Sequence, residues 1–190
     1  ESSKGTTLFE SYDKDHCFYN PLVWLDPALA KEEVYNIEKG LENADPENLN
    51  YYRSNAEKYK QKLEELDAEL KEKTSKFRTK KYIGFHPSFT YFNKRYGLEY
   101  AAVIEEFAGD EPSAKEMAHI VDVTRENGIT TLFSEPFLDP RAAETIAKEI
   151  GGSVVSLNPM STLTPDARAE GKDYLAIMRD NLAKLSEALS

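Results

Sequence analysis

The chain has 190 residues, 40% of them hydrophobic and 11% aromatic, enough to bury the core of one domain with a smaller appendage. Thirty-four acidic residues outnumber 24 basic ones and give a net charge of -10, which argues against nucleic acid as a partner, because phosphate binding requires clustered lysine and arginine. No segment approaches the roughly 20 apolar residues that cross a bilayer, and the polar first residues lack the core of a signal peptide, so any leader is expected to have been removed.

Two Asp-Pro pairs predict two helix starts in the first half of the chain, after an irregular segment of residues 1–26. The pair at residues 26–27 is expected to cap a helix that reaches Leu41, because aspartate accepts free backbone N–H groups and proline fits the first turn. The pair at residues 45–46 opens a longer helix that ends near Thr74.

The second helix is long for a small domain, at roughly 40 Å for a rise of 1.5 Å per residue. Its apolar residues recur at alternating spacings of three and four, which places them on one face. They are Leu49, Tyr52, Ala56, Tyr59, Leu63, Leu66 and Leu70. This pattern predicts a strut that connects two bodies. A coiled-coil seam is the alternative interpretation, because the same spacing defines one.

After Phe77 the pattern changes to strands that alternate with helices. Strands are predicted at residues 81–85, 101–107, 129–134 and 153–157. Helices are predicted at residues 88–96, 112–127, 140–150 and 172–189, and Ser113 with Glu116 forms a capping box for the second of these. The alternation predicts an α/β fold: a mainly parallel four-stranded sheet that is covered by helices, has right-handed crossovers and is preceded by the long connecting helix.

Polar residues follow three of the predicted strands. They are His86, Glu135 and Asn158. Loops at the carboxyl ends of parallel strands line the ligand crevice of open α/β sheets, so these three residues are expected to lie near one another. The alternative interpretation is that Glu135 and Asn158, each followed by proline, only stabilise turns.

A second group of possible metal ligands precedes the first helix. Asp13, Asp15, His16 and Cys17 offer carboxylate, imidazole and thiolate donors, which suit zinc. A solvated acidic loop is the competing interpretation, because close spacing in sequence does not ensure convergent geometry. His119 falls in the middle of a predicted helix and is expected to be a surface or boundary residue.

The sequence resembles the metal-binding receptor proteins of zinc and manganese ABC importers from about Asn20 to Leu189. The strongest segment begins at His86 and reads His-Pro-Ser-Phe-Thr-Tyr-Phe, with Tyr-Gly-Leu at residues 96–98. Further matching segments are residues 23–27, 45–48, 111–114, 133–136 and 143–147, together with Tyr52, Asn55, Tyr59, Leu63, Tyr174 and residues 178–181. The resemblance implies two α/β lobes joined by one long helix, with the metal in the cleft between them and His86 as a ligand.

Mapped on this family, the chain is divided into three parts. Residues 1–45 correspond to a remnant of the N-terminal lobe, residues 46–75 to the connecting helix and residues 80–190 to the C-terminal lobe. Most of the N-terminal lobe is therefore expected to be missing. Leu22 stands where the family usually has a ligand histidine, and neither Asn158 nor Thr162 supplies the carboxylate that some members place after the last strand.

These observations favour an extracytoplasmic, periplasmic or cell-surface receptor that would hold Zn²⁺ or Mn²⁺ and pass it to an ABC permease, with ligands drawn from His86, Glu135, Asn158 and His16. The alternative is an assembly module that has lost the metal and self-associates. Without its usual cover, such a module would expose apolar residues. Those expected to be partly exposed are Trp24, Tyr52, Tyr59, Leu63 and the aromatic residues of residues 89–96. An enzyme is the least favoured class, because no nucleophile-base arrangement or phosphate-binding loop is present in the sequence.

Overall fold

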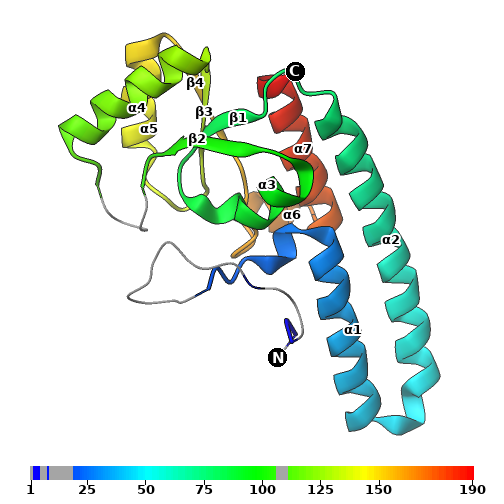
Figure 1. Ribbon diagram of the computed structural model, residues 1–190. Coiled ribbons are helices and arrows are strands. Elements are labelled where there is room, and N and C mark those ends of the chain that lie inside the picture. Colours follow the sequence, from blue (N-terminus) through cyan, green and yellow to red (C-terminus); the bar gives the residue numbers. More distant parts are fainter. Residues whose placement is uncertain (1, 5–7, 9–18, 106–110) are drawn as a thin grey trace.

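The computed structural model describes residues 2–4, 8, 19–105 and 111–190, which form an α/β body with a long helical hairpin projecting from it (Figure 1). The helices are α1 (Pro27–Ala44), α2 (Leu49–Ser75), α3 (Thr90–Tyr96), α4 (Ala114–Asn127), α5 (Arg141–Ile150), α6 (Pro165–Ala169) and α7 (Tyr174–Leu189). The strands are β1 (Lys81–Gly84), β2 (Glu99–Val103), β3 (Thr131–Ser134) and β4 (Ser153–Ser156). Single 3-10 turns, Val23–Leu25, Pro46–Asn48 and Pro87–Phe89, precede α1, α2 and α3.

The four strands form one parallel sheet in the order β2-β1-β3-β4, which confirms the predicted fold class. The strand β2 starts earlier than the sequence pattern predicts, because Tyr100 pairs with Tyr82 of β1. It ends at Val103, although the amide of Glu105 still donates to the carbonyl of Phe85 at 2.8 Å. Residues 106–107 of the predicted strand lie outside the described residues.

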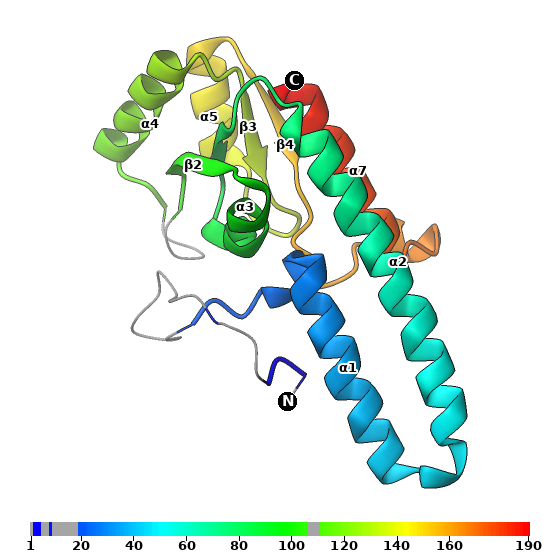
Figure 2. The same cartoon turned by 45° about the vertical axis from the view of Figure 1, so that its right-hand side comes forward.

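The sheet separates two hydrophobic cores because successive side chains of a strand point to opposite faces. On β1, Tyr82 belongs to the core beneath α2, α3 and α7, whereas Ile83 belongs to the core beneath α4 and α5. Leu132 and Phe133 of β3 alternate in the same way. The helices on the two faces are seen on either side of the sheet in Figure 2. No helix among the described residues combines the length and the apolar character needed to cross a membrane.

Helices α1 and α2 pack against each other as an antiparallel hairpin (Figures 1 and 2). Asp26 caps α1 as predicted, because its carboxylate accepts the N–H of Ala28 at 2.8 Å. Asp45 differs from the prediction: its side chain makes no cap to the backbone, and a 3-10 turn separates it from α2. Its carboxylate instead accepts hydrogen bonds from Asn48 and from the Tyr52 hydroxyl.

The apolar face predicted for α2 is buried only over the half of the helix that covers the α/β body. Leu63, Leu66 and Leu70 are at most 1% exposed, whereas Tyr52 and Tyr59 are half-buried. Beside this face, Arg95 of α3 forms two hydrogen bonds with the carboxylate of Asp67, at 2.6 and 2.7 Å. The ion pair fastens α3 to α2, so the body and the inner half of the hairpin are one packed unit.

The expectation of partial exposure holds for Trp24, Tyr52 and Tyr59, which are half-buried, but it is wrong for Leu63 and for the aromatic residues of residues 89–96. The aromatic residues are buried because α3 lies between the sheet and α2, where they fill the core. They are Phe89, Tyr91, Phe92 and Tyr96. Among the described residues the exposed large hydrophobic side chains lie elsewhere, with Tyr35, Ile37, Leu41 and Tyr51 on the hairpin.

Candidate functional site

His86 lies in the connection between β1 and α3, two residues beyond the carboxyl end of the strand. It is half-buried, and its Nδ1 atom lies 3.2 Å from the hydroxyl oxygen of Ser88. The 3-10 turn that follows is held by the Thr90 hydroxyl, which donates to the carbonyl of Pro87 at 2.6 Å. The imidazole is therefore carried by a short turn with internal hydrogen bonds.

The segment that contains Leu22 lies beside this turn. The side-chain amide of Asn20 donates to the carbonyl of Pro87 at 3.2 Å, and the Tyr91 hydroxyl donates to the carbonyl of Asn20 at 2.9 Å. The carboxamide oxygen of Asn20 also accepts the N–H of Leu22 at 2.9 Å. Two segments more than 60 positions apart in the sequence thus meet at the His86 turn.

Glu135 follows β3 and lines the same small cavity as His86, which has a volume of about 10 Å³. Burial raises the pKa of the Glu135 carboxyl to about 7, and a hydrogen-bonding interaction with the Ser88 side chain acts in the opposite direction. A cavity of this size holds at most one water molecule, so a carboxylate here has little bulk solvent around it. The predicted neighbourhood of His86 and Glu135 is present.

Asn158 follows β4, and the hydrogen bonds of its side chain and backbone stabilise the loop in which it lies. Its carboxamide oxygen accepts the N–H of Met160 at 2.8 Å. Its backbone N–H and C=O pair with the side chain of Asn181 at 2.9 and 2.8 Å. The neighbouring Leu157, rather than Asn158, lines the cavity of His86 and Glu135. The loop is also tied to the Leu22 segment, because Trp24 donates its indole N–H to the carbonyl of Pro159 at 3.0 Å.

Of the remaining candidates of the sequence analysis, the structure places only His119. His16, with Asp13, Asp15 and Cys17, lies outside the described residues. His119 is exposed on α4, which packs on the opposite face of the sheet from α3 and agrees with the expected surface position.

Tyr100 of β2 forms a hydrogen bond with the turn that follows His86. This contact was not predicted from the sequence. The Tyr100 hydroxyl accepts the backbone N–H of Phe89 at 2.8 Å, and its ring packs against Tyr82 with a centroid separation of 4.9 Å. The ring occupies the space above Gly84, where a Cβ atom would come within 2.4 Å of it. An isolated glycine inside a strand often marks such a close approach, and that signal was available in the sequence.

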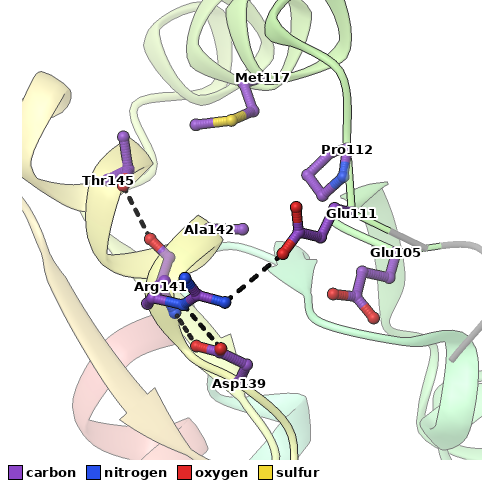
Figure 3. A pocket seen from close by; sticks show the side chains of 8 residues that line it. All are labelled: Glu105, Glu111, Pro112, Met117, Asp139, Arg141, Ala142 and Thr145. Atoms are coloured by element: carbon purple, nitrogen blue, oxygen red, sulfur yellow. Dashed lines mark hydrogen bonds and ion pairs between the residues drawn. The ribbon is translucent and has the colours of Figure 1, made fainter. Parts of the chain in front are cut away.

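A second hollow, of about 200 Å³, lies between α4 and α5 and contains none of the predicted ligands (Figure 3). Arg141 projects into it and is paired with Asp139 at 2.6 Å and with Glu111 at 3.4 Å. Met117 and Ala142 form an apolar side. Two of the acidic residues that line this hollow, Asp139 and Glu111, are thus paired with Arg141.

Residues 1–188 match the profile of a family described as zinc-uptake complex component A, periplasmic (ZnuA). The chain belongs to the ZnuA family. The high-affinity zinc uptake system protein ZnuA of Bacillus subtilis is 31% identical over 199 residues, which cover 99% of this chain and 62% of that relative. The chain therefore spans less than two thirds of the relative's length.

Solved structures share the fold over the whole chain. A crystal structure of ZnuA superposes with a TM-score of 0.86 at 31% identity and covers 100% of this chain, which corresponds to 70% of the solved one. A mutant structure of the laminin-binding adhesin Lmb of Streptococcus agalactiae gives a TM-score of 0.87 at 34% identity, with the same coverage. The fold that carries the His86 turn is therefore shared with these solved structures.

The ZnuA resemblance also defines what the described part of the chain lacks. Leu22 lies in the segment that packs against the His86 turn, and its hydrocarbon side chain has no lone pair to donate. No group of three or more histidine, cysteine, aspartate or glutamate residues within residues 19–105 and 111–190 is arranged to hold a metal ion. Among the described residues, His86 and Glu135 are the two predicted ligands that line a common cavity.

Proposed function

We propose that this chain is part of an extracytoplasmic zinc receptor that binds Zn²⁺ as cargo for an ABC importer. The observation that supports the proposal best is the position of His86: a half-buried imidazole at a parallel-strand end, in a family described as a zinc-uptake component. The family is described as periplasmic, which agrees with a location outside the cytoplasm. Zinc is favoured over manganese because the curated relatives are named for zinc.

His86 is the principal ligand in this proposal. The other predicted ligands differ in how well their surroundings suit metal binding. Glu135 lines the same cavity and is proposed as an oxygen neighbour of the bound ion. The carboxamide oxygen of Asn158 already accepts a backbone N–H, so it is a weaker candidate. His16 is retained as a proposed nitrogen donor, since a tetrahedral zinc site needs about four donors.

We also propose that the chain is divided as in a two-lobed receptor of this family. Residues 80–190 form the C-terminal lobe, residues 46–75 the connecting helix, and residues 1–45 the end of an N-terminal lobe. The partners are then an ABC permease and the remainder of an N-terminal lobe, which would close the cleft over His86. Because the chain spans 62% of the Bacillus subtilis relative, these assignments concern the full-length protein.

The proposal is tested by titrating the purified chain with Zn²⁺ in the presence of a competing chromophoric chelator. We expect stoichiometric binding, and we expect His86→Ala to weaken it by about 100-fold or more, since even outer-shell changes cost roughly 10–100-fold. His119→Ala is the matched control, because His119 is exposed on another face and should leave affinity unchanged. Equal affinities of wild type and His86→Ala would refute the proposal.

The second candidate function, self-association without metal, is favoured by one observation. Ile37 and Leu41, one turn apart on α1, are 53% and 42% exposed, and Tyr51 at the start of α2 is 66% exposed. A dimer that covers this surface would sediment as a larger species at high concentration, and Ile37→Glu would restore the monomer. A monomer at all concentrations that binds zinc through His86 would leave only the receptor function.

A further inference from the structure

Residues 20–24, which we call the strap, are hydrogen-bonded to two loops at the carboxyl edge of the sheet. At one end of the strap, the side-chain amide of Asn20 donates to the carbonyl of Pro87 at 3.2 Å. At the other end, the indole N–H of Trp24 donates to the carbonyl of Pro159 at 3.0 Å. The strap therefore joins the loop that follows β1 to the loop that follows β4.

The two carbonyl groups belong to residues that directly follow predicted ligands. Pro87 follows His86, and Pro159 follows Asn158. Proline has no N–H, so its carbonyl is the backbone group through which a hydrogen bond can hold it. The strand order is β1-β3-β4 in this part of the sheet, so Glu135, which follows β3, leaves the sheet between the two loops. Neighbouring strands lie about 4.8 Å apart, so the strap bridges roughly 10 Å.

Each end of the strap is also held through its own backbone. The Tyr91 hydroxyl of α3 donates to the carbonyl of Asn20 at 2.9 Å, and the Tyr174 hydroxyl of α7 donates to the carbonyl of Trp24 at 2.7 Å. Asn20 is buried and Trp24 is half-buried, so water competes little for these hydrogen bonds. Helices α3 and α7 thus fix both ends of the strap relative to the α/β body.

The strap is rigid between its ends because local hydrogen bonds fold it. The carboxamide oxygen of Asn20 accepts the N–H of Leu22 at 2.9 Å. The 3-10 turn Val23–Leu25 follows directly, and the N–H of Leu25 donates to the carbonyl of Leu22 at 3.2 Å. The orientation of the Asn20 amide is fixed as well, because its oxygen faces a donor and its nitrogen faces an acceptor. A rigid segment that is held at both ends acts as a spacer between the loops.

We propose that the side chains at the two ends of the strap are positioning groups, and that the strap sets the distance between the His86 turn and the Asn158 loop. Asn20 and Trp24 do not bind the ion in this proposal but act through the loops that they hold. Metal sites depend on such support, because loss of an outer-shell partner typically lowers affinity by roughly 10–100-fold. That the spacing serves Zn²⁺ rests on the proposed function. The spacing itself does not, because its hydrogen bonds are present in the chain without metal.

Hydrogen–deuterium exchange of the metal-free chain, measured peptide by peptide, tests the Trp24 end of the strap. Trp24 is the single tryptophan of the sequence, so tryptophan replacement by benzothienylalanine, which has sulfur in place of the indole N–H, changes this position alone. Amide exchange in the Asn158 loop should rise about five-fold, the effect of one net hydrogen bond. Because the strap is rigid, exchange in the His86 turn should rise as well. Trp24→Phe is the second variant, with the same expected direction in both loops.

Asn20→Ala tests the other end of the strap. Exchange in the His86 turn should rise about five-fold, and exchange in the Asn158 loop should follow. Thr124→Val is the control for lost stability, because the buried Thr124 hydroxyl donates to the carbonyl of Val121 at 2.6 Å within α4, on the other face of the sheet. It should leave exchange in both loops unchanged.

A His86 turn whose exchange does not respond to loss of the Trp24 N–H would overturn the proposal, because two independent contacts do not make a spacer. The expected exchange in a chain that binds no Zn²⁺ would uphold the strap and contradict the proposed function. In a chain that binds Zn²⁺, Asn20→Ala and the tryptophan replacement should each weaken binding about ten-fold, whereas Thr124→Val should not. Unchanged Zn²⁺ affinity in the first two variants would overturn the positioning role.

Discussion

The hydroxyl of Tyr100 accepts the backbone N–H of Phe89 at 2.8 Å, and so links β2 to the turn that carries His86. Tyr100 is half-buried, and desolvation of its hydroxyl raises the pKa of that group well above the usual value. The hydroxyl is therefore a neutral group at all relevant pH values, and its role is to satisfy the Phe89 amide. A buried N–H without an acceptor costs free energy, so this bond couples the packing of the sheet to the geometry of the site.

Tyr100→Phe should lower the free energy of unfolding by about 1–3 kcal/mol, because it leaves the Phe89 N–H unpaired while it keeps the ring. Urea denaturation monitored by circular dichroism measures the change. Tyr51→Phe is the control, since Tyr51 is 66% exposed and should change stability by less than about 0.5 kcal/mol. A Tyr100→Phe protein as stable as wild type would show that water or another group replaces the hydroxyl.

Gly84→Ala should destabilise the protein, because the added Cβ would lie 2.4 and 2.9 Å from two ring atoms of Tyr100. The ring is confined by Tyr82, so relief of the clash requires a shift in the core, at a cost of about 1–3 kcal/mol. Gly40→Ala on α1 is a sharp contrast: nothing lies within 4 Å of the position that its Cβ would take, and alanine favours the helix by about 0.5–1 kcal/mol. Thermal unfolding of both variants should show opposite shifts in Tm.

Much of the α/β body could be predicted from local sequence signals. Ser113 and Glu116 form the capping box that their spacing indicates, with bonds of 3.3 and 2.7 Å. The alternation of strands and helices indicated the parallel sheet, because such connections have few other solutions. The proximity of His86 and Glu135 followed from the same topology, since both leave carboxyl ends of neighbouring strands.

The features that sequence reasoning missed depend on contacts between distant segments. The short helix α6 has no long apolar pattern, and the turn at Pro46–Asn48 depends on how α1 meets α2. The burial of α3 was misjudged because its aromatic residues could equally face solvent or a partner until α2 was placed over them. The hydrogen bonds between the Asn181 side chain and the backbone of Asn158 join residues that are 23 positions apart. No local sequence pattern predicts such a contact.

Asp67→Asn should reduce stability most near neutral pH. Burial raises the pKa of Asp67, but hydrogen bonds from Arg95, Lys71 and Tyr96 outweigh it and lower the pKa to about 2. A carboxyl whose pKa is lower in the folded state stabilises the fold above its unfolded value of 3.8, and this contribution is lost as the pH falls toward 2. The gap between wild type and Asp67→Asn should therefore be roughly 1–2 kcal/mol at pH 7 and shrink below pH 4.

Urea unfolding of both proteins at pH 7, 4 and 2.5 measures this gap. Glu42, whose pKa is also lowered to about 2 by hydrogen bonds from Arg53 and Lys39, is common to both proteins, so its contribution cancels in the difference. A gap that stays constant from pH 7 to pH 2.5 would mean that the charge of Asp67 is not what holds α3 to α2.

Asn181→Ala should be among the most destabilising substitutions in the C-terminal half. The Asn181 side chain is fully buried and satisfies both the N–H and the C=O of Asn158, at 2.9 and 2.8 Å. Its loss leaves two backbone groups without partners, which should lower the free energy of unfolding by about 2–3 kcal/mol. Asn127→Ala is the matched control, because Asn127 is exposed and bonds only the carbonyl of Val123 in its own helix.

Asn181→Asp separates the two hydrogen bonds of this side chain. A carboxylate still accepts the Asn158 N–H but faces the Asn158 carbonyl without a proton to donate, so the variant should be less stable at pH 7 than at pH 4. Zinc affinity measured on the same variants then places the loop: an Asn181→Ala protein that remains folded and binds zinc less tightly would put the Asn158 loop at the site. An unchanged affinity would confine the site to the His86 side, where Glu135 is the neighbouring donor.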